Sequence, residues 1–590
     1  MESRVGKSIK NTIFGMVGLL ISQIFSFIAR SIFINILGVE YNGVNGLFSN
    51  ILQVLSLAEL GFATSIAYAL YRPLKEHDEK TTAMLMNYFA KIYRIIALVV
   101  AVVGCCCIPF LQYLISEDIS ELSFSIGQLR IYFGMYLANT VCSYLLAYKR
   151  TIITADQNAY LVSNVDNLCN IGLNILQIIL LYLTKSFYAF LGIMIAKTVL
   201  NNLILHLVAG KKYPYLANYK KEKLPKEEKT QLFKNVQAMF CHRIGGVVIY
   251  STSSIIISAF VSLIDAGKYS NYLMVVSFVN AFISIIFNSV TASIGNLCIE
   301  DDKRYQYIVF KRLSYLSDAI SVFVFVCYVC LFNDFISLWV GQDMQFDLLT
   351  VVAISLSGMV TCMRKTVNAF RDATGIFRQD WYKPLIETAV AIGAAIGLSY
   401  IWGTFGVILG YTLATLFIAV PIEDVVLFRF GLQQKVRYQF IRTLVTIGIA
   451  AGLAALTYFI CTFIPFGIGW FILKAIFVIV FSICAIVVMT FHTPEFKYYL
   501  SLSQRLFQKI FRRGKKPAEA EGPAMGVQAE TSGLAQQEAA AADAQAQPDA
   551  TAEEETSQSG QMSADRESAG SGTDGEASAT DKGSAIHPQT

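Results

Sequence analysis

The stretch "IIALVVAVVGCCCIPFLQYLI", residues 95–115, contains 21 residues and no charged side chain. A helix of about 20 apolar residues is long enough to cross the roughly 30 Å hydrocarbon core of a bilayer. A strand of a membrane barrel would instead alternate apolar and polar residues over about ten positions. This stretch therefore predicts a transmembrane helix, and similar runs recur along the first 491 residues.

The composition of the whole chain agrees with this interpretation. Of its 590 residues, 55% are hydrophobic and 15% are charged, whereas a soluble protein has about 25% charged residues. We predict an all-α polytopic membrane protein with fourteen transmembrane helices. The expected spans are approximately 12–37, 44–70, 95–115, 131–148, 165–184, 187–208, 245–264, 270–297, 313–333, 347–369, 384–402, 405–428, 441–463 and 467–491.

The distribution of lysine and arginine predicts the orientation of these spans. Basic residues gather in the N-terminal segment, in every second loop and after the last span. The intervening loops contain Lys185 and Lys268, with Arg130 at the outer start of the fourth span. Because basic loops stay in the cytoplasm, we expect both termini on the cytoplasmic side of the plasma membrane. The first apolar run is too long for a signal peptide, so we expect it to remain as an anchor.

Two weak internal repeats divide the membrane part of the chain. Residues 149–172 align with 370–393 at an offset of 221, and residues 37–48 align with 262–273 at an offset of 225. Such repeats, in parallel orientation, are typical of transporters that rock around a central site. We therefore predict two six-helix lobes in a parallel repeat plus two extra helices. The expected parts are a lobe at 1–208, a basic cytoplasmic connector at 209–244, a second lobe at 245–428, and two extra helices with a basic juxtamembrane segment at 429–516.

The last part of the chain, residues 517–590, differs sharply in composition. It holds 14 acidic residues against Arg566 and Lys582, and very few large apolar residues. A segment of this kind cannot bury enough apolar surface to fold, so a disordered acidic cytoplasmic tail is expected. Just before it, "RLFQKIFRRGKK" (505–516) predicts a short basic amphipathic stretch on anionic membrane lipids.

Cysteine and histidine give no indication of a bound metal. The twelve cysteines fall mostly within predicted spans, and the five histidines form no cluster. Buried cysteines inside helices usually pack as small apolar side chains. We expect no metal site, no cofactor and no disulfide framework.

Ionisable residues deep inside the predicted spans are the candidate functional residues. Lys197 lies near the midplane, Glu59 at a similar or greater depth, and Arg30 and Lys474 about 10 Å below the outer ends of their helices. Snorkelling to the interface would explain Arg30 or Lys474. An ion pair of Glu59 with Arg30 or Lys197 would serve packing alone. The remaining interpretation is a polar cavity with net positive charge.

Other charged residues lie near the cytoplasmic ends of spans, where helix caps or solvated ends would explain them. They are Asp166, Asp318, Glu387, Glu423 and Asp424. The repeat suggests that Asp166 pairs with Arg150, and Glu387 with Arg371. In the same alignments Arg30 corresponds to Ile255 and Glu59 to Ser284, so the second half is expected to lack the deep charges of the first.

Three segments carry a resemblance to a known family. They are "LGVEYNGVNGLFSNILQVLSLAELGFATSIAYALYRPL" (37–74), "TADQNAYLVSNVDNL" (154–168) and "DATGIFRQDWYKPLIET" (372–388). Together with Arg30 they resemble bacterial polysaccharide transporters of the O-antigen flippase type. These belong to the multidrug/oligosaccharidyl-lipid/polysaccharide flippase superfamily, and the likeness extends over about residues 5–495.

The resemblance implies a transporter rather than an enzyme. It implies two lobes around a cavity that opens alternately to each side, and a substrate of isoprenoid diphosphate carrying an oligosaccharide repeat unit. It also implies that the two extra spans form a groove for the lipid tail. Arg30 suits the cationic cavity of such flippases, and Lys197 and Glu59 are predicted to join it from their depth alone. Arginine matches phosphate oxygens with a rigid fork, and lysine offers a point charge.

The expected partners are the lipid-linked oligosaccharide, membrane lipids, and polysaccharide polymerase and glycosyltransferases, with no nucleic acid. Three other functions remain open. A flippase for the peptidoglycan lipid precursor would need the same chemistry. An ion-coupled multidrug exporter would usually place carboxylates in the cavity. A membrane polymerase or ligase would need a large outer loop, whereas the longest one here, about 334–346, offers only Asp334 and Asp343.

The predicted topology can be tested by labelling single cysteines in a variant without native cysteines. Positions near 220 and 530 are expected to react only from the inner face. Position 220 lies in the basic connector, and position 530 follows the basic segment after the last span. Positions near 118 and 343 are expected to react from outside. A cysteine at 343 that reacts only after the inner face has been opened would contradict the fourteen-span topology.

Overall fold

The computed structural model describes residues 4–59, 62–118, 121–156, 158–219, 222, 224–299, 302–376 and 379–512. Within these ranges some helix positions are described by backbone alone, among them 4–17, 58–59 and 234–247. The chain divides into two units, Met1–Gly514 and Lys515–Thr590. The second unit, and with it the predicted tail 517–590, lies outside the described residues.

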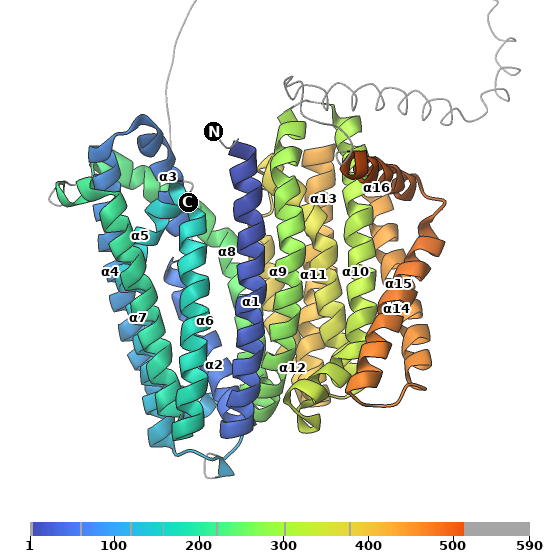
Figure 1. Ribbon diagram of the computed structural model, residues 1–590, viewed down its shortest axis with the longest axis horizontal. Coiled ribbons are helices and arrows are strands. Elements are labelled where there is room, and N and C mark those ends of the chain that lie inside the picture. Colours follow the sequence, from blue (N-terminus) through green and yellow to red (C-terminus); the bar gives the residue numbers. More distant parts are fainter. Residues whose placement is uncertain are drawn as a thin grey trace, which may run out of the picture. The chain divides into compact units, whose positions relative to one another are not determined.

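The described part is built from helices, with no strand in it. Its first half contains α1 (Arg4–Leu37), α2 (Val39–Leu55), α3 (Phe62–Glu76), α4 (Glu79–Cys107), α5 (Ile126–Ala155), α6 (Ala159–Thr184) and α7 (Phe187–Lys212). Its second half contains α8 (Lys226–Phe260), α9 (Leu263–Ile299), α10 (Lys303–Val340), α11 (Leu348–Thr374), α12 (Lys383–Ala414), α13 (Val420–Val426), α14 (Arg437–Cys461), α15 (Ile468–Thr490) and α16 (Pro494–Arg512). The long helices run side by side, and α16 lies across the ends of its neighbours (Figure 1).

Polar side chains and glycine set several helix ends. The Asp78 carboxylate accepts a hydrogen bond from the Thr81 N–H at 3.0 Å at the start of α4, and Asp347 accepts one from the Thr350 N–H at 3.1 Å at the start of α11. Each satisfies a backbone donor that the first turn leaves without a partner. At the other end of α11, Gly375 adopts a left-handed conformation (φ 68°), which glycine reaches without steric cost.

Ten helices in the described residues are long and apolar enough to cross a membrane. The difference from the fourteen predicted spans has a structural reason. One of the ten, Lys383–Leu432, contains two predicted spans, because the chain reverses at Gly403 (φ 54°, ψ −134°). Three further predicted spans correspond to α2 with α3, to α5 and to α8, which are not among the ten. The all-helical membrane fold is confirmed, while the count of fourteen and the lobe boundaries stay predictions.

The two halves meet where α2 crosses α9. A side chain at Gly43 would collide with the Leu263 carbonyl, and a Cβ at Gly267 would lie 2.9 Å from the backbone of both Gly43 and Val39. Small residues let membrane helices approach backbone to backbone. The two segments in contact are the pair that the sequence alignment relates at an offset of 225, and Asn42 donates a 2.7 Å hydrogen bond to the carbonyl of Gly267, its counterpart in that alignment.

Helix α1 also packs against the second half, through aromatic side chains. The Phe27 ring contacts Phe278, Phe335 and Trp339 edge-on, with centroids 4.8 to 6.2 Å apart. The Trp339 indole N–H donates to the Phe27 carbonyl at 3.0 Å, and the Ser31 hydroxyl donates to the Trp339 carbonyl at 3.1 Å. These contacts join α1 to α9 and α10.

Helices α14 and α15, which the sequence predicted as extra helices, are attached to α10 by ion pairs inside the apolar packing. Arg442 of α14 donates to the Asp318 carboxylate at 2.7 Å, and Lys474 of α15 donates to Asp334 at 2.6 Å. Lys474 therefore has a carboxylate partner, so snorkelling is not needed to explain it. The sequence placed Asp334 in a loop, but α10 continues to Val340 and carries it within the helix.

The α2–α9 crossing yields a prediction about stability. Gly267→Val is expected to lower the unfolding midpoint of the detergent-purified protein, because the new side chain collides with the backbone of α2. Overpacking of this kind costs at least about 1–3 kcal/mol. Gly295→Val on the same helix is the matched control, since nothing lies within 4 Å of a Cβ there. Equal midpoints for the two variants would show that the crossing is not tightly packed.

Candidate functional site

Arg30 of α1 lies at the contact between the halves and has a neutral partner. Its guanidinium donates to the amide oxygen of Asn42, which is fully buried. The Asn42 amide nitrogen in turn lies 3.2 Å from both the Ser270 hydroxyl and the Asn271 side-chain oxygen of α9. No carboxylate among the described side chains forms an ion pair with Arg30. Arg30 therefore contacts the neutral amide of Asn42, which in turn is hydrogen-bonded to the second half.

A second set of contacts holds the two halves together at the end where α8 turns into α9. The Glu117 carboxylate, which follows α4, accepts hydrogen bonds from the Ser262 hydroxyl and the Leu263 N–H, both at 2.7 Å. Nearby, the Ser116 N–H donates to the Ser258 carbonyl at 3.0 Å. Burial disfavours the ionised carboxylate, but these donors outweigh it and hold the pKa of Glu117 below its usual value. The first half is thus tied to the turn between α8 and α9.

Polar side chains continue along α2 and α9 beyond this closed end. Ser49 and Gln53 are on the face of α2 that carries Asn42, and both are exposed. Ser277 and Asn288 are on or near the face of α9 that carries Ser270, and they are exposed too. Polar groups at membrane depth occur where they are buried in protein or line a water-filled space. The two helices that meet at Gly43 and Gly267 therefore present polar, accessible faces farther along.

Lys365 of α11 reaches this polar face of α9. Its ammonium donates to the Ser284 hydroxyl at 2.8 Å, and the side chain is half-buried. Ser284 is the residue that the alignment places opposite Glu59, so the second half does bring a deep charge to that position. Lys365 is not among the residues predicted from the sequence; its only signal there is a pair of basic residues, Arg364 and Lys365, inside a predicted span.

Lys197 and Glu59 are not joined to Arg30 by any contact that the structure describes. Lys197 of α7 is half-buried near Cys169 of α6, inside the first half. None of the described side chains forms a hydrogen bond or ion pair with its ammonium. Glu59 ends the short 3-10 turn Ser56–Glu59, and its side chain lies outside the described residues. An ion pair between Glu59 and either cation remains a hypothesis.

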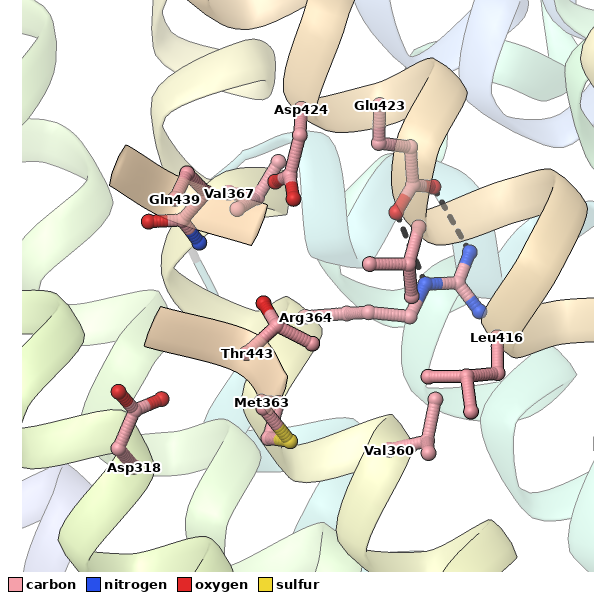
Figure 2. A pocket seen from close by; sticks show the side chains of 11 residues that line it. Asp318, Val360, Met363, Arg364, Val367, Leu416, Glu423, Asp424, Gln439 and Thr443 are labelled. Atoms are coloured by element: carbon pink, nitrogen blue, oxygen red, sulfur yellow. Dashed lines mark hydrogen bonds and ion pairs between the residues drawn. The ribbon is translucent and has the colours of Figure 1, made fainter. Parts of the chain in front are cut away.

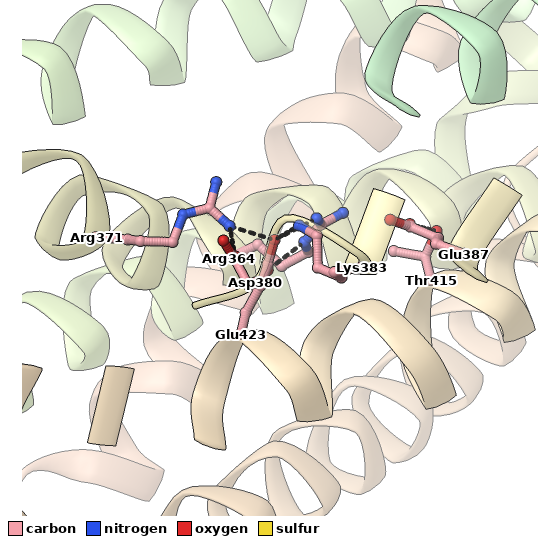
Figure 3. Close-up of polar contacts among 7 residues, drawn as sticks. All are labelled: Arg364, Arg371, Asp380, Lys383, Glu387, Thr415 and Glu423. Carbon is pink, nitrogen blue, oxygen red and sulfur yellow. Dashed lines mark hydrogen bonds and ion pairs between the residues drawn. The ribbon is translucent and has the colours of Figure 1, made fainter. Parts of the chain in front are cut away.

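The neighbouring basic residues of the second half contrast with these cations, because they share a buried carboxylate. Glu423 accepts two hydrogen bonds from Arg364, at 2.7 and 2.8 Å (Figure 2), and further ones from Lys383 and from Arg371 at 3.3 Å (Figure 3). Arg371 also donates to Asp380 at 2.8 Å. Three cations thus share two buried carboxylates, and these contacts join α11, α12 and α13.

The two ion pairs suggested by the repeat had different outcomes. Arg150 does donate to Asp166, and Asn201 donates to the same carboxylate at 2.8 Å. The second pairing is wrong: Arg371 contacts Asp380 and Glu423, while Glu387 accepts a 3.0 Å hydrogen bond from Thr415 (Figure 3). Glu423 comes from a helix farther along the chain, and its carboxylate occupies the place near Arg371.

The comparison with known proteins supports a transporter fold. The solved structure named "Lipid II flippase MurJ, inward closed conformation" matches with a TM-score of 0.56 and 14% identity, over 81% of this chain and 98% of that one. An inward-facing multidrug resistance MATE family transporter of the MOP superfamily matches with the same score and identity, over 70% of this chain and 98% of that one. No curated protein matches the sequence.

The sequence itself matches one family model, described as "Polysaccharide biosynthesis protein", over residues 8–292. This range begins within α1 and ends within α9, and it includes Gly267. The resemblance seen in the sequence is thereby confirmed. Residues 8–292 of the chain are thus similar to polysaccharide biosynthesis proteins, and the chain has the fold of the MurJ flippase and of the MATE transporter.

Proposed function

We propose that this protein is a flippase for surface polysaccharide assembly. It moves isoprenoid-diphosphate-linked oligosaccharide repeat units from the inner to the outer leaflet of the plasma membrane by alternating access. The observation that carries the proposal is the pair of cations with neutral partners, Arg30 and Lys365, beside exposed polar faces of α2 and α9. Polysaccharide polymerase and glycosyltransferases would be its partners in the pathway.

The charge pattern favours an anionic substrate. A cation in a low-dielectric interior is costly unless an anion or several strong acceptors balance it. Arg364, Arg371 and Lys383 have such anions, whereas Arg30 and Lys365 rely on amide and hydroxyl oxygens. A diphosphate would supply the missing negative charge, and the hydroxyls of the attached sugars would hydrogen-bond to the polar faces. Lys197, within the first half, would contact it only in another state of the transport cycle.

The contacts between the halves support an inward-facing state. The ties at Asn42 and Glu117 lie at the end where α8 turns into α9. In the predicted orientation, with both termini inside, this end faces outward because its loops carry few basic residues. Access from the cytoplasm with a closed outer end is the state that accepts substrate from the inner leaflet. We include in this proposal the predicted fourteen transmembrane spans and two six-helix lobes.

The extra helices α14 and α15 suit the lipid part of such a substrate. Both expose large apolar side chains along most of their length, among them Leu444, Phe459, Ile472 and Val488. A groove beside them would hold an isoprenoid tail while the diphosphate and sugars stay in the polar space.

Two alternatives follow from the same residues. A flippase for the peptidoglycan lipid precursor would use the same cations, because that substrate is also a lipid diphosphate; the family match to polysaccharide biosynthesis favours the first proposal. An ion-coupled multidrug exporter is less well supported. Arg30 and Lys365, the cations beside the polar faces of α2 and α9, would repel organic cations.

Variants of Arg30 and Lys365 test the proposed substrate contacts. Arg30→Leu and Lys365→Gln are each expected to reduce surface polysaccharide about tenfold or more, because a charge-assisted hydrogen bond contributes about 1.5–3 kcal/mol. Arg30→Lys is expected to retain part of the export, since the positive charge remains but the paired N–H donors of the planar guanidinium are lost. Lys197→Arg is expected to be milder than Lys197→Ala. Surface polysaccharide and the amount of protein in the membrane are measured together.

The double variant Lys474→Met, Asp334→Asn is the matched control for these substitutions. It removes a membrane cation together with its own carboxylate, and normal export is expected. Normal export by Arg30→Leu would remove Arg30 from the substrate path. A loss of membrane protein in Arg30→Leu that Glu59→Gln reverses would instead show that Arg30 and Glu59 form a packing ion pair.

Cross-linking tests alternating access. Cysteines in place of Glu117 and Ser262 would join the two halves at the closed end, where these side chains are in contact. Cross-linking is expected to stop export, and reduction of a disulfide cross-link is expected to restore it. The control pair replaces Glu40 and Ser123, which are in contact within the first half. Unimpaired export with the 117–262 pair fully cross-linked would contradict opening at this end.

A further inference from the structure

A groove lies where α10 and α14 begin, at the end of the second half that is opposite the α8–α9 turn. Its volume is about 670 Å³, which is within the range of sites that hold small molecules, roughly 300–1,000 Å³. Helix α10, the turn before α14 and the first residues of α14 form its wall. The residues that line it are Tyr307, Lys311, Gln433, Gln434, Lys435 and Tyr438.

The groove carries two positive charges without an opposite charge in its wall. The Lys311 ammonium lies 5.3 Å from the centre of the Tyr307 ring, and the Lys435 side chain is exposed. Neither ammonium forms an ion pair with a described side chain. Glu495 of α16 lies near Tyr307 but does not line the groove. An anion in the groove would therefore meet two cations that no described carboxylate neutralises.

Neutral hydrogen-bond donors complete the wall. The hydroxyls of Tyr307 and Tyr438 and the side-chain amides of Gln433 and Gln434 form no hydrogen bond with a described residue. A phosphate group carries negative charge and offers several strong acceptor oxygens. Ammonium groups and uncharged N–H and O–H donors around one space are the partners that such a group requires. The chemistry of the wall thus favours a ligand that contains a phosphate.

The backbone of Gln433 has an unusual conformation at the edge of the groove. Its φ of 54° and ψ of 43° are left-handed, and helix ends in this conformation usually carry glycine, which has no Cβ to collide. A residue other than glycine there is uncommon, and such positions gather at ligand-binding sites. The left-handed residue ends the π-helical turn Leu427–Leu432 and starts the segment whose side chains line the groove.

Helix α16 marks the level of the membrane surface beside the groove. The Tyr499 hydroxyl donates to the Arg312 carbonyl at 3.2 Å, and the Arg312 guanidinium lies 3.8 Å from the centre of the Tyr498 ring. Arg312 directly follows Lys311, so α16 packs against α10 next to the groove, across the ends of the long helices (Figure 1). An amphipathic helix lies in the plane of the lipid headgroups. The groove is therefore at headgroup height, on the cytoplasmic side in the predicted orientation.

We propose that this groove binds the phosphate of an anionic membrane phospholipid. Lys311 and Lys435 would engage the phosphate oxygens, with the tyrosine hydroxyls and glutamine amides as further donors. Farther along α14, on the face that carries Tyr438, Ile441 and Val445 are exposed apolar side chains. They suit the acyl chains of a lipid, which a soluble phosphate lacks. The bound lipid would join α10 to the turn before α14, and this inference does not depend on the transported substrate.

Thermal unfolding of the full chain, purified in an uncharged detergent, tests the site. Phosphatidylglycerol added to the micelles is expected to raise the unfolding midpoint by about 2 °C or more in a saturable manner, because it binds the folded state only. Phosphatidylcholine is expected to give a much smaller rise, because its choline cancels the phosphate charge. The double variant Lys311→Gln, Lys435→Gln is expected to lose at least half of the rise with phosphatidylglycerol.

The double variant Lys75→Gln, Lys211→Gln is the matched control. It removes the same charge from two exposed lysines of the first half, and it should retain the whole rise. Native mass spectrometry of the single variant Lys435→Gln gives a second readout if the groove double variant does not fold. This variant removes an exposed side chain, and it is expected to retain less phosphatidylglycerol than the unmodified protein.

Three results would overturn the proposal. A phosphatidylglycerol effect that the groove double variant retains in full would place the lipid elsewhere, for example along α16. An equal saturable rise with glycerol phosphate or inorganic phosphate would show that the ligand is a soluble phosphate. Retention of an isoprenyl phosphate but not of phosphatidylglycerol would show that the groove does not take a phospholipid.

Discussion

The close crossing of α2 and α9 is the contact on which the arrangement of the two halves depends. Gly43 and Gly267 let the two backbones approach, and only at that distance can the Asn42 amide donate to the Gly267 carbonyl while accepting from Arg30. Glu117 ties the halves at the same end. Since both ties are hydrogen bonds to neutral groups, they can be exchanged for water when the halves separate, which a large apolar contact could not do as readily.

The charges inside the membrane fall into two groups with different physical situations. In the second half, Arg364, Arg371 and Lys383 each form an ion pair with Glu423 or Asp380, so these side chains hold the ends of helices together. Outside this group, Arg30 and Lys365 meet only amide and hydroxyl oxygens. Because an unbalanced charge is costly at low dielectric, this difference separates structural ion pairs from the cations that suit an anionic substrate.

Helices α14 and α15 are likewise held to the rest of the bundle by ion pairs. Helix α10 carries Asp318 and Asp334 about 24 Å apart along its axis, and each receives one cation, Arg442 from α14 and Lys474 from α15. The apolar contacts between these helices bury surface but do not specify how far one helix is shifted along another. Each ion pair fixes the position of one helix along the axis of α10. Asp424 lies beside the first of these pairs and is the acidic residue of this region without an ion pair of its own in the described structure.

The sequence by itself determined the membrane class, the helices and the relation between residues 37–48 and 262–273, because apolar run length and repeats are local properties of the chain. It also predicted the Arg150–Asp166 pair. It could not choose the partner of Arg371, since Glu423 arrives from a helix about 50 residues away. Nor could it show that Lys365 meets Ser284, 81 residues earlier. Partner choice among buried charges depends on which helix faces pack together, and only the tertiary structure decides that.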